Sequence, residues 1–113
     1  MKTVAQMKEC IGLRKKKLNE ARIHIVNQLK KMGALKIILF GSSVSGNISN
    51  TSDLDFIVIM PPTKSGWEWV NEIYKNIDRK VSADIIAYTA EEFEKMKRES
   101  PFVQYALKTG KEL

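Results

Sequence analysis

The chain has 113 residues, of which 43% are hydrophobic and 28% charged, and its formal net charge is +6. We expect one domain with a real core, because this length leaves little room for a second. The composition is that of a soluble globular protein and excludes the disordered and fibrous classes. The apolar runs are too short to cross a bilayer, and the amino terminus leads into no signal-peptide core, so we expect a cytoplasmic protein without a membrane partner.

Metal or redox chemistry based on cysteine and histidine finds little support in the sequence. The single cysteine, Cys10, excludes an internal disulfide framework and cannot by itself form a structural zinc site. The only histidine, His24, falls in a helical segment and is interpreted as an ordinary helix residue. The basic residues are dispersed, and their densest cluster, residues 14–17, lies within the same segment. We interpret this cluster as a solvated helix face, with an acidic partner or a phosphate ligand as the alternative.

The chain opens with a long helix. Apolar residues recur at helical spacing between residues 3 and 32, and Gly33 is suited to end the helix. The apolar stripe is interrupted at residues 14–17, so residues 1–17 are expected to form a separate helix or an extension that packs on a partner. The core of the single domain is then residues 18–113.

Two strands and a polar connection follow this helix. The first strand, Lys36 to Phe40, is rich in β-branched and aromatic residues and runs into Gly41-Ser42. A short helical turn is expected at residues 42–46 because serine is a good helix N-cap. A polar loop then leads to the second strand, which is expected from Asp53 to Met60, before a pair of prolines.

The second half of the chain alternates between helices and one more strand. One face of an amphipathic helix is predicted from the spacing of Trp67, Val70, Ile73, Tyr74 and Ile77. This spacing assigns Trp67 to the core and leaves the position of Trp69 open. A third strand is predicted over residues 81–88.

Two short helices are expected to close the chain. Thr89 and Glu92 have the spacing of a capping box, which predicts a helix start. Pro101 is suited to the first turn of a further helix, which Gly110 ends. The whole order predicts an α/β (α+β) fold, a small mixed β-sheet with helices packed on it.

Three carboxylates, Asp53, Asp55 and Asp84, stand on strands that are otherwise apolar. Alternate side chains of a strand share a face, so Asp53 and Asp55 point the same way, about 7 Å apart. If the second and third strands are neighbours, Asp84 can lie on that face as well. Carboxylates in such surroundings need a cation or hydrogen-bond donors. Three aspartates can hold two Mg²⁺ ions in the geometry that serves phosphoryl transfer.

The turn after the first strand is a candidate phosphate site. Gly41 permits close approach of a ligand to the backbone, Ser42 adds a hydroxyl donor, and Ser43 is a second candidate N-cap. Taken singly, Asp53 could be a turn cap and Asp84 an edge-strand charge that prevents aggregation. The combination of a glycine-serine turn with three strand aspartates favours metal binding and catalysis.

At these residues the sequence resembles the minimal nucleotidyltransferases of the DNA polymerase beta superfamily, over roughly residues 18–113. Their signature is a strand ending in Gly-Ser, a spacer of about ten residues, Asp-x-Asp on the next strand and a later strand Asp; here the spacer is residues 43–52. The resemblance implies a polymerase beta-like fold and a nucleoside triphosphate held by Gly41-Ser42. It also implies that Asp53 and Asp55 bind Mg²⁺. Asp84 would join them and help to deprotonate the acceptor hydroxyl.

The resemblance further implies a Mg²⁺-dependent transferase that moves a nucleoside monophosphate, AMP from ATP, to a hydroxyl of a partner protein. Family members of this size are commonly paired with a helical HEPN-domain protein. Some are the antitoxin of a toxin-antitoxin pair and adenylylate a HEPN ribonuclease toxin. An oligomeric assembly is compatible with this role.

Two alternatives stay open. Many relatives carry arginines directly after Gly-Ser, whereas this chain has Ser43-Val44-Ser45-Gly46. The absence of these two phosphate-facing charges favours a non-catalytic binding module that neutralises its partner by docking alone. The net charge of +6 suggests, as a second alternative, a nucleic-acid-binding domain.

Overall fold

The computed structural model describes residues 4–40, 54–79 and 81–113. Its elements, in chain order, are α1 (Val4–Lys31), β1 (Lys36–Phe40), β2 (Leu54–Met60), α3 (Gly66–Asn76), β3 (Ala83–Thr89), α4 (Ala90–Glu99), α5 (Pro101–Thr109) and β4 (Lys111–Glu112). The short helical turn expected at residues 42–46 lies outside the described residues. Each of the other predicted helices and strands is present, and the two-residue strand β4 is an addition to them.

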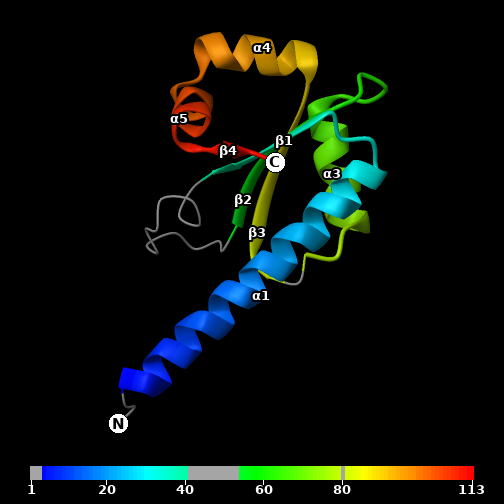
Figure 1. The fold of residues 1–113 in the computed structure, drawn as a ribbon. Coiled ribbons are helices and arrows are strands. Elements are labelled where there is room, and N and C mark those ends of the chain that lie inside the picture. Colours follow the sequence, from blue (N-terminus) through cyan, green and yellow to red (C-terminus); the bar gives the residue numbers. More distant parts are fainter. Residues whose placement is uncertain (1–3, 41–53, 80) are drawn as a thin grey trace.

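The strands form one four-stranded sheet in the order β3-β2-β1-β4. β1 is antiparallel to both β2 and β4, whereas β2 and β3 are parallel. A parallel pair needs a crossover connection, which α3 provides between β2 and β3. Figure 1 shows the helices packed around this sheet. The mixed sheet and its helices confirm the predicted fold class.

The sheet is covered by helices on both faces. On one face, here called the α1/α3 face, alternate side chains of the strands pack with Ala21, Ile25 and Leu29 of α1 and with Trp69 and Ile73 of α3. On the other, the α4/α5 face, the intervening side chains pack with Phe93 of α4 and with Val103 and Ala106 of α5. All residues of the inner strand β2 are buried, which explains its nearly continuous apolar sequence.

The long helix α1 runs unbroken from Val4 to Lys31, so the basic cluster at residues 14–17 does not interrupt it. Its carboxyl-terminal half packs on the sheet, and its amino-terminal half extends away from the sheet (Figure 1). The helix ends as expected at Gly33, whose φ of 107° lies in the left-handed region that favours glycine.

The sequence-based assignment of Trp67 to the core is wrong, and the structure settles the position of Trp69, which the sequence left open. Trp69 is 7% exposed, and its indole nitrogen donates a hydrogen bond of 2.8 Å to the carbonyl of Pro61. Trp67 is 74% exposed.

The buried stripe of α3 is Gly66, Trp69 and Ile73. The predicted face is right at Ile73 and Ile77, which are buried, and at Val70, which packs against the core. The apolar spacing gave no signal for Gly66, which has no side chain.

The close packing of Gly66 generates the first prediction. A Cβ atom at Gly66 would lie 2.4 Å from the carbonyl oxygen of Ala87, a backbone atom that cannot rotate away. We expect Gly66→Ala to lower the free energy of unfolding by about 1–3 kcal/mol, the usual cost of overpacking. Denaturant unfolding followed by circular dichroism measures the loss. Asn71→Ala, an exposed change on the same helix, is the control and should alter stability little. A Gly66→Ala protein as stable as the parent would contradict this packing.

Candidate functional site

The structure brings two of the predicted site residues together. In the parallel pairing of β2 with β3, Asp55 and Asp84 are direct Cα partners. Neighbouring strands lie about 4.8 Å apart, and paired residues point to the same face of a sheet. The two aspartates therefore lie side by side on the α4/α5 face, as expected from the sequence if these strands were neighbours.

The two carboxylates differ in exposure. Asp55, on the inner strand β2, is 7% exposed and has an interaction partner within the protein. Its Cα partner on the other side is Phe40, the last residue of β1, whose ring packs edge-on against Phe102 of α5 at 5.4 Å. Asp84, on the edge strand β3, is exposed. The pair thus joins an inner carboxylate to one that faces solvent.

The other predicted site residues, Gly41, Ser42, Ser43 and Asp53, lie outside the described residues. Gly41 directly follows Phe40 in the chain, and Phe40 is paired with Asp55. The connection between β1 and β2 therefore leaves and re-enters the sheet at the end where the aspartates lie.

The donor set of this pair suits a hard cation. Mg²⁺ prefers oxygen ligands and commonly takes one or two carboxylates, with water and substrate phosphates completing its shell. Asp55 and Asp84 supply two such carboxylates from neighbouring strands. Within the described ranges, no cluster of three or more His, Cys, Asp or Glu residues could hold a metal ion. The assignment of three aspartate ligands and two ions remains a prediction.

The histidine lies in another layer of the protein. His24 is on α1, which packs on the α1/α3 face, whereas the aspartates lie on the opposite face of the sheet. Its Nε2 atom is 3.6 Å from a carboxylate oxygen of Asp78. This placement agrees with its interpretation as an ordinary helix residue rather than a base for the aspartate site.

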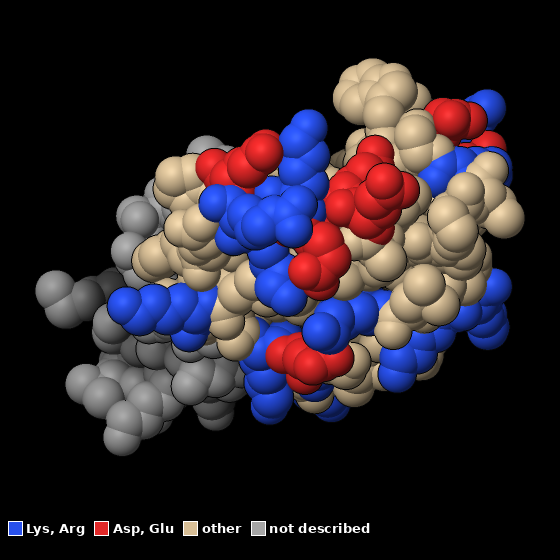
Figure 2. Space-filling view, turned by 90° about the horizontal axis from the view of Figure 1, so that it is seen from above, with Lys and Arg blue, Asp and Glu red and all other residues tan. Residues whose placement is uncertain are grey.

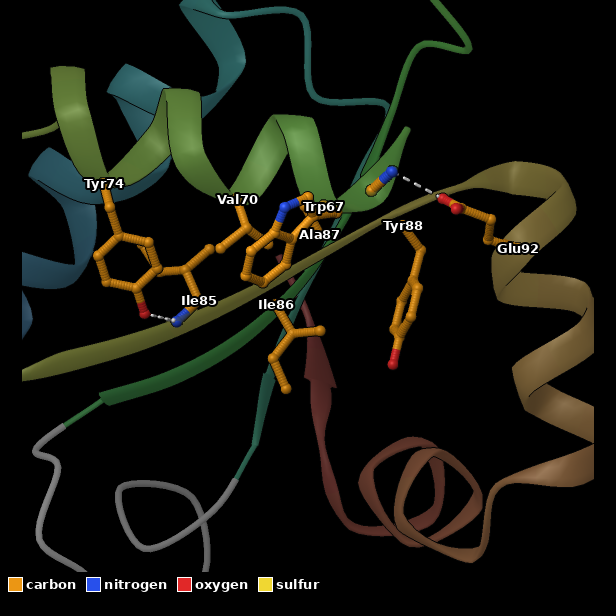
Figure 3. Close-up of a pocket in the computed structure, with 9 residues that line it drawn as sticks. Trp67, Val70, Tyr74, Ile85, Ile86, Ala87, Tyr88 and Glu92 are labelled. Atoms are coloured by element: carbon orange, nitrogen blue, oxygen red, sulfur yellow. Dashed lines mark hydrogen bonds between the residues drawn. The ribbon is translucent and has the colours of Figure 1, made fainter. Parts of the chain in front are cut away.

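A pocket of about 390 Å³, which the sequence did not reveal, lies beside β3. Its walls come from α3, from residues 85–88 of β3 and from Glu92 of α4. Figure 3 shows Trp67, Val70 and Tyr74 projecting from α3 toward the strand. The aromatic residues of α3 were the one sequence signal for this pocket, and the sequence analysis assigned Trp67 to the core.

Glu92 of α4 forms hydrogen bonds to α3 and β3 at one end of this pocket. Its Oε1 atom accepts hydrogen bonds from the backbone N–H groups of Thr89, at 2.8 Å, and Gly66, at 2.9 Å. The hydrogen bond from Thr89 is the main reason why the pKa of Glu92 is lowered, and that from Gly66 adds to it. Burial, and then the negative charge of Glu92, raise the pKa of Tyr88.

The lowered pKa of Glu92 generates a prediction about pH. A carboxylate whose folded pKa lies below its unfolded value, near 4.5, stabilises the fold above that pH, and the contribution is lost as the pH falls through the folded pKa. We expect Glu92→Gln to cost about 1 kcal/mol at pH 7. The difference in unfolding free energy from the parent should narrow below about pH 4.5.

Chemical denaturation of both proteins from pH 3 to pH 7 measures this difference. Glu91→Gln, at the exposed neighbouring position, is the matched control and should show little loss at any pH. A Glu92→Gln loss that stays constant over the whole pH range would show that the ionised carboxylate does not stabilise the junction.

Charge on the surface is mixed. Figure 2 shows Lys and Arg side chains interspersed with Asp and Glu on the face seen from above. Among the described residues seen on this face, the basic side chains do not form one continuous patch of the kind that neutralises a nucleic-acid backbone. Among the described residues, no helix has both the length and the apolar character needed to traverse a lipid bilayer.

A small mixed sheet with aspartates paired on neighbouring strands, and with Gly41-Ser42 next to β1 in the sequence, fits the class of phosphoryl-transfer domains. The comparison with protein families agrees. The family model described as "Nucleotidyltransferase domain" matches residues 22–109, and the chain belongs to this family. Nucleotidyl transfer is the function that this membership supports. No curated protein and no solved structure matches the chain.

Proposed function

We propose that this protein is a Mg²⁺-dependent nucleotidyltransferase that transfers a nucleoside monophosphate, AMP from ATP, to a hydroxyl of a partner protein. The observation that carries the proposal is the direct pairing of Asp55 with Asp84 on one face of the sheet. Membership of the nucleotidyltransferase family supports the reaction class.

In the proposed reaction, the acceptor oxygen attacks the α-phosphorus of the nucleoside triphosphate. A new phosphorus–oxygen bond forms, the bond from the α-phosphorus to the bridging oxygen breaks, and pyrophosphate leaves in line with the attack. Asp84 accepts the proton of the acceptor hydroxyl, because it is the exposed member of the pair and can reach an incoming group. Positioning and charge neutralisation supply most of the rate enhancement in this type of reaction.

Magnesium would be held by Asp55 and Asp84 together with Asp53, the third aspartate of the sequence pattern. Bound ions in such sites neutralise charge that develops on the phosphoryl group. Gly41, Ser42 and Ser43 follow β1, which is paired with β2, so we assign the phosphate tail of the triphosphate to this side of the site. The reactive end of the nucleotide then lies toward β3.

A HEPN-domain protein is the partner that the resemblance to minimal nucleotidyltransferases suggests, with this chain as the antitoxin of the pair. The amino-terminal half of α1 extends away from the sheet, which leaves room for such a partner beside the domain (Figure 1). The alternative is a non-catalytic module that neutralises its partner by docking. The missing arginines after Gly-Ser favour this alternative, and the paired aspartates oppose it.

Substitution of the aspartates separates the two functions. We expect Asp55→Asn and Asp84→Asn each to lower nucleotidyl transfer at least about 100-fold, because each removes a charged oxygen ligand or proton acceptor from the reacting groups. The assay combines α-³²P-labelled ATP, Mg²⁺ and the protein encoded by the adjacent gene, and measures label on that protein. Binding of the partner to both variants should stay unchanged.

Glu94→Gln, which changes an exposed carboxylate on α4, is the control and should transfer label normally. Chelation of the divalent cation with EDTA should stop transfer, and added Mg²⁺ should restore it. Failure of the folded parent to label a bound partner, with both Asn variants still neutralising it, would favour the docking module. Affinity for RNA or DNA that falls steeply with salt would favour nucleic-acid binding instead.

A further inference from the structure

We propose that the pocket beside β3 binds an apolar side chain of the acceptor protein. In the acceptor sequence, this side chain lies two residues from the residue that carries the acceptor hydroxyl. The inference rests on the proposed function, in which Asp84 receives the hydroxyl proton. It adds to that function a recognition element that selects the acceptor segment.

The pocket has the size and lining for one large side chain. It measures about 390 Å³ and is lined mainly by aromatic and aliphatic groups. Trp67, which is 74% exposed, and Tyr74, another exposed aromatic, contribute from α3, while Ile86 and Tyr88 contribute from β3. Figure 3 shows the α3 side chains on one side of the strand and Ile86 and Tyr88 on the other. An exposed tryptophan beside such a hollow is typical of a recognition site rather than of a free surface.

Three backbone groups on the open edge of β3 already have side-chain partners, which distinguishes this pocket from a site for strand addition. Arg79 donates a hydrogen bond of 3.0 Å to the carbonyl of Ala83, and the N–H of Ile85 donates to the hydroxyl of Tyr74 at 2.8 Å. At the other end of β3, Glu92 accepts from the N–H of Thr89. An incoming strand would have to displace these three bonds, so an inserted side chain is the occupant that fits.

The spacing along β3 matches that of an extended peptide. Asp84 and Ile86 are alternate residues of the strand and lie on the same face, about 7 Å apart. In an extended acceptor segment, residues i and i+2 are separated by the same distance. A segment that presents its hydroxyl to Asp84 therefore carries the side chain two residues away to Ile86 and the pocket.

The route by which a macromolecule can reach the two aspartates also favours the acceptor as the ligand of this pocket. Asp55 is buried, and on its far side β1 ends at Phe40, which packs against Phe102. Asp84 is exposed on the outermost strand, so a macromolecule reaches the carboxylates past β3. In-line displacement requires the acceptor to approach opposite to the leaving pyrophosphate, and the proposed phosphate side is that of β1.

Charge selects the kind of segment. The carboxylate of Asp84 lies at one end of this stretch of β3, and that of Glu92 lines the pocket at the other end. The guanidinium of Arg79, which donates to the carbonyl of Ala83 and lies 4.7 Å from the ring centroid of Tyr74, adds a positive charge at the same edge. A segment that is neutral beside its apolar residue is complementary to this mixed charge.

Two short peptides test the inference with the full chain. Acetyl-Ser-Ala-Phe-amide carries a hydroxyl and an aromatic side chain at the required spacing, and acetyl-Ser-Ala-Ala-amide lacks the ring. We expect the first to bind about tenfold more tightly, because burial of part of one aromatic side chain has this effect. Titration followed by ¹H–¹⁵N correlation spectra should shift the indole signal of Trp67 and the amide signals of Ile86 and Tyr88.

Two variants complete the test. Trp67→Ala should reduce the affinity for the Phe peptide to that for the Ala peptide. Tyr105→Ala, which removes an exposed aromatic ring from α5, is the matched control and should leave binding unchanged. Equal affinity for the two peptides, or shifts confined to other residues, would overturn the inference. Shifts of the Trp67 indole on addition of ATP and Mg²⁺ alone would also overturn it and assign the pocket to the nucleobase.

The proposed function is tested separately in the same samples. Label from α-³²P ATP on the Phe peptide reports transfer, and Trp67→Ala should raise KM for this peptide without changing KM for ATP. Selective binding without transfer by the parent would count against the proposed function and leave the pocket as a docking site. Transfer with an unchanged peptide KM in Trp67→Ala would count against the pocket alone.

Discussion

The parallel register between β2 and β3 is the constraint on which the candidate site depends. It pairs Asp55 with Asp84, and a slip of one residue would turn every side chain of β3 to the opposite face. The apolar alternation of β3 resists such a slip, because Ala83, Ile85 and Ala87 are all buried in the core of the α1/α3 face. The same hydrophobic packing that stabilises the edge strand therefore holds its exposed carboxylate beside the buried one.

The edge strand β3 has a second role that follows from its position. An unpaired strand edge is open to aggregation, and here side chains of neighbouring elements occupy it: Tyr74 from α3, Arg79 from the segment before β3 and Glu92 from α4. These contacts stabilise the crossover between β2 and β3. Between α3 and the strand they leave a hollow, which is the proposed acceptor pocket. Its β3 wall begins at Ile85, the residue after Asp84.

Much of the fold could be predicted from the sequence because its signals are local. The capping box of Thr89 and Glu92 and the stop at Gly33 depend on neighbouring residues and were predicted correctly. The buried face of α3 was predicted only in part: Val70, Ile73 and Ile77 contact the core as expected, whereas Gly66, which carries no apolar side chain, gave no signal for its packing against Ala87. The strand β4 was missed because Lys111 and Glu112 have no strand signal of their own and pair only where the sheet presents β1.

For the site, the sequence by itself determined the residue types: carboxylates within apolar segments, with a Gly-Ser pair before them, because residue chemistry and spacing are local properties of the chain. Only the tertiary structure decided that β2 and β3 are parallel neighbours and that Asp55 is buried while Asp84 is exposed. It alone placed Trp67 on the surface beside a pocket. Strand order and exposure depend on contacts between residues far apart in the chain, and no local pattern encodes those contacts.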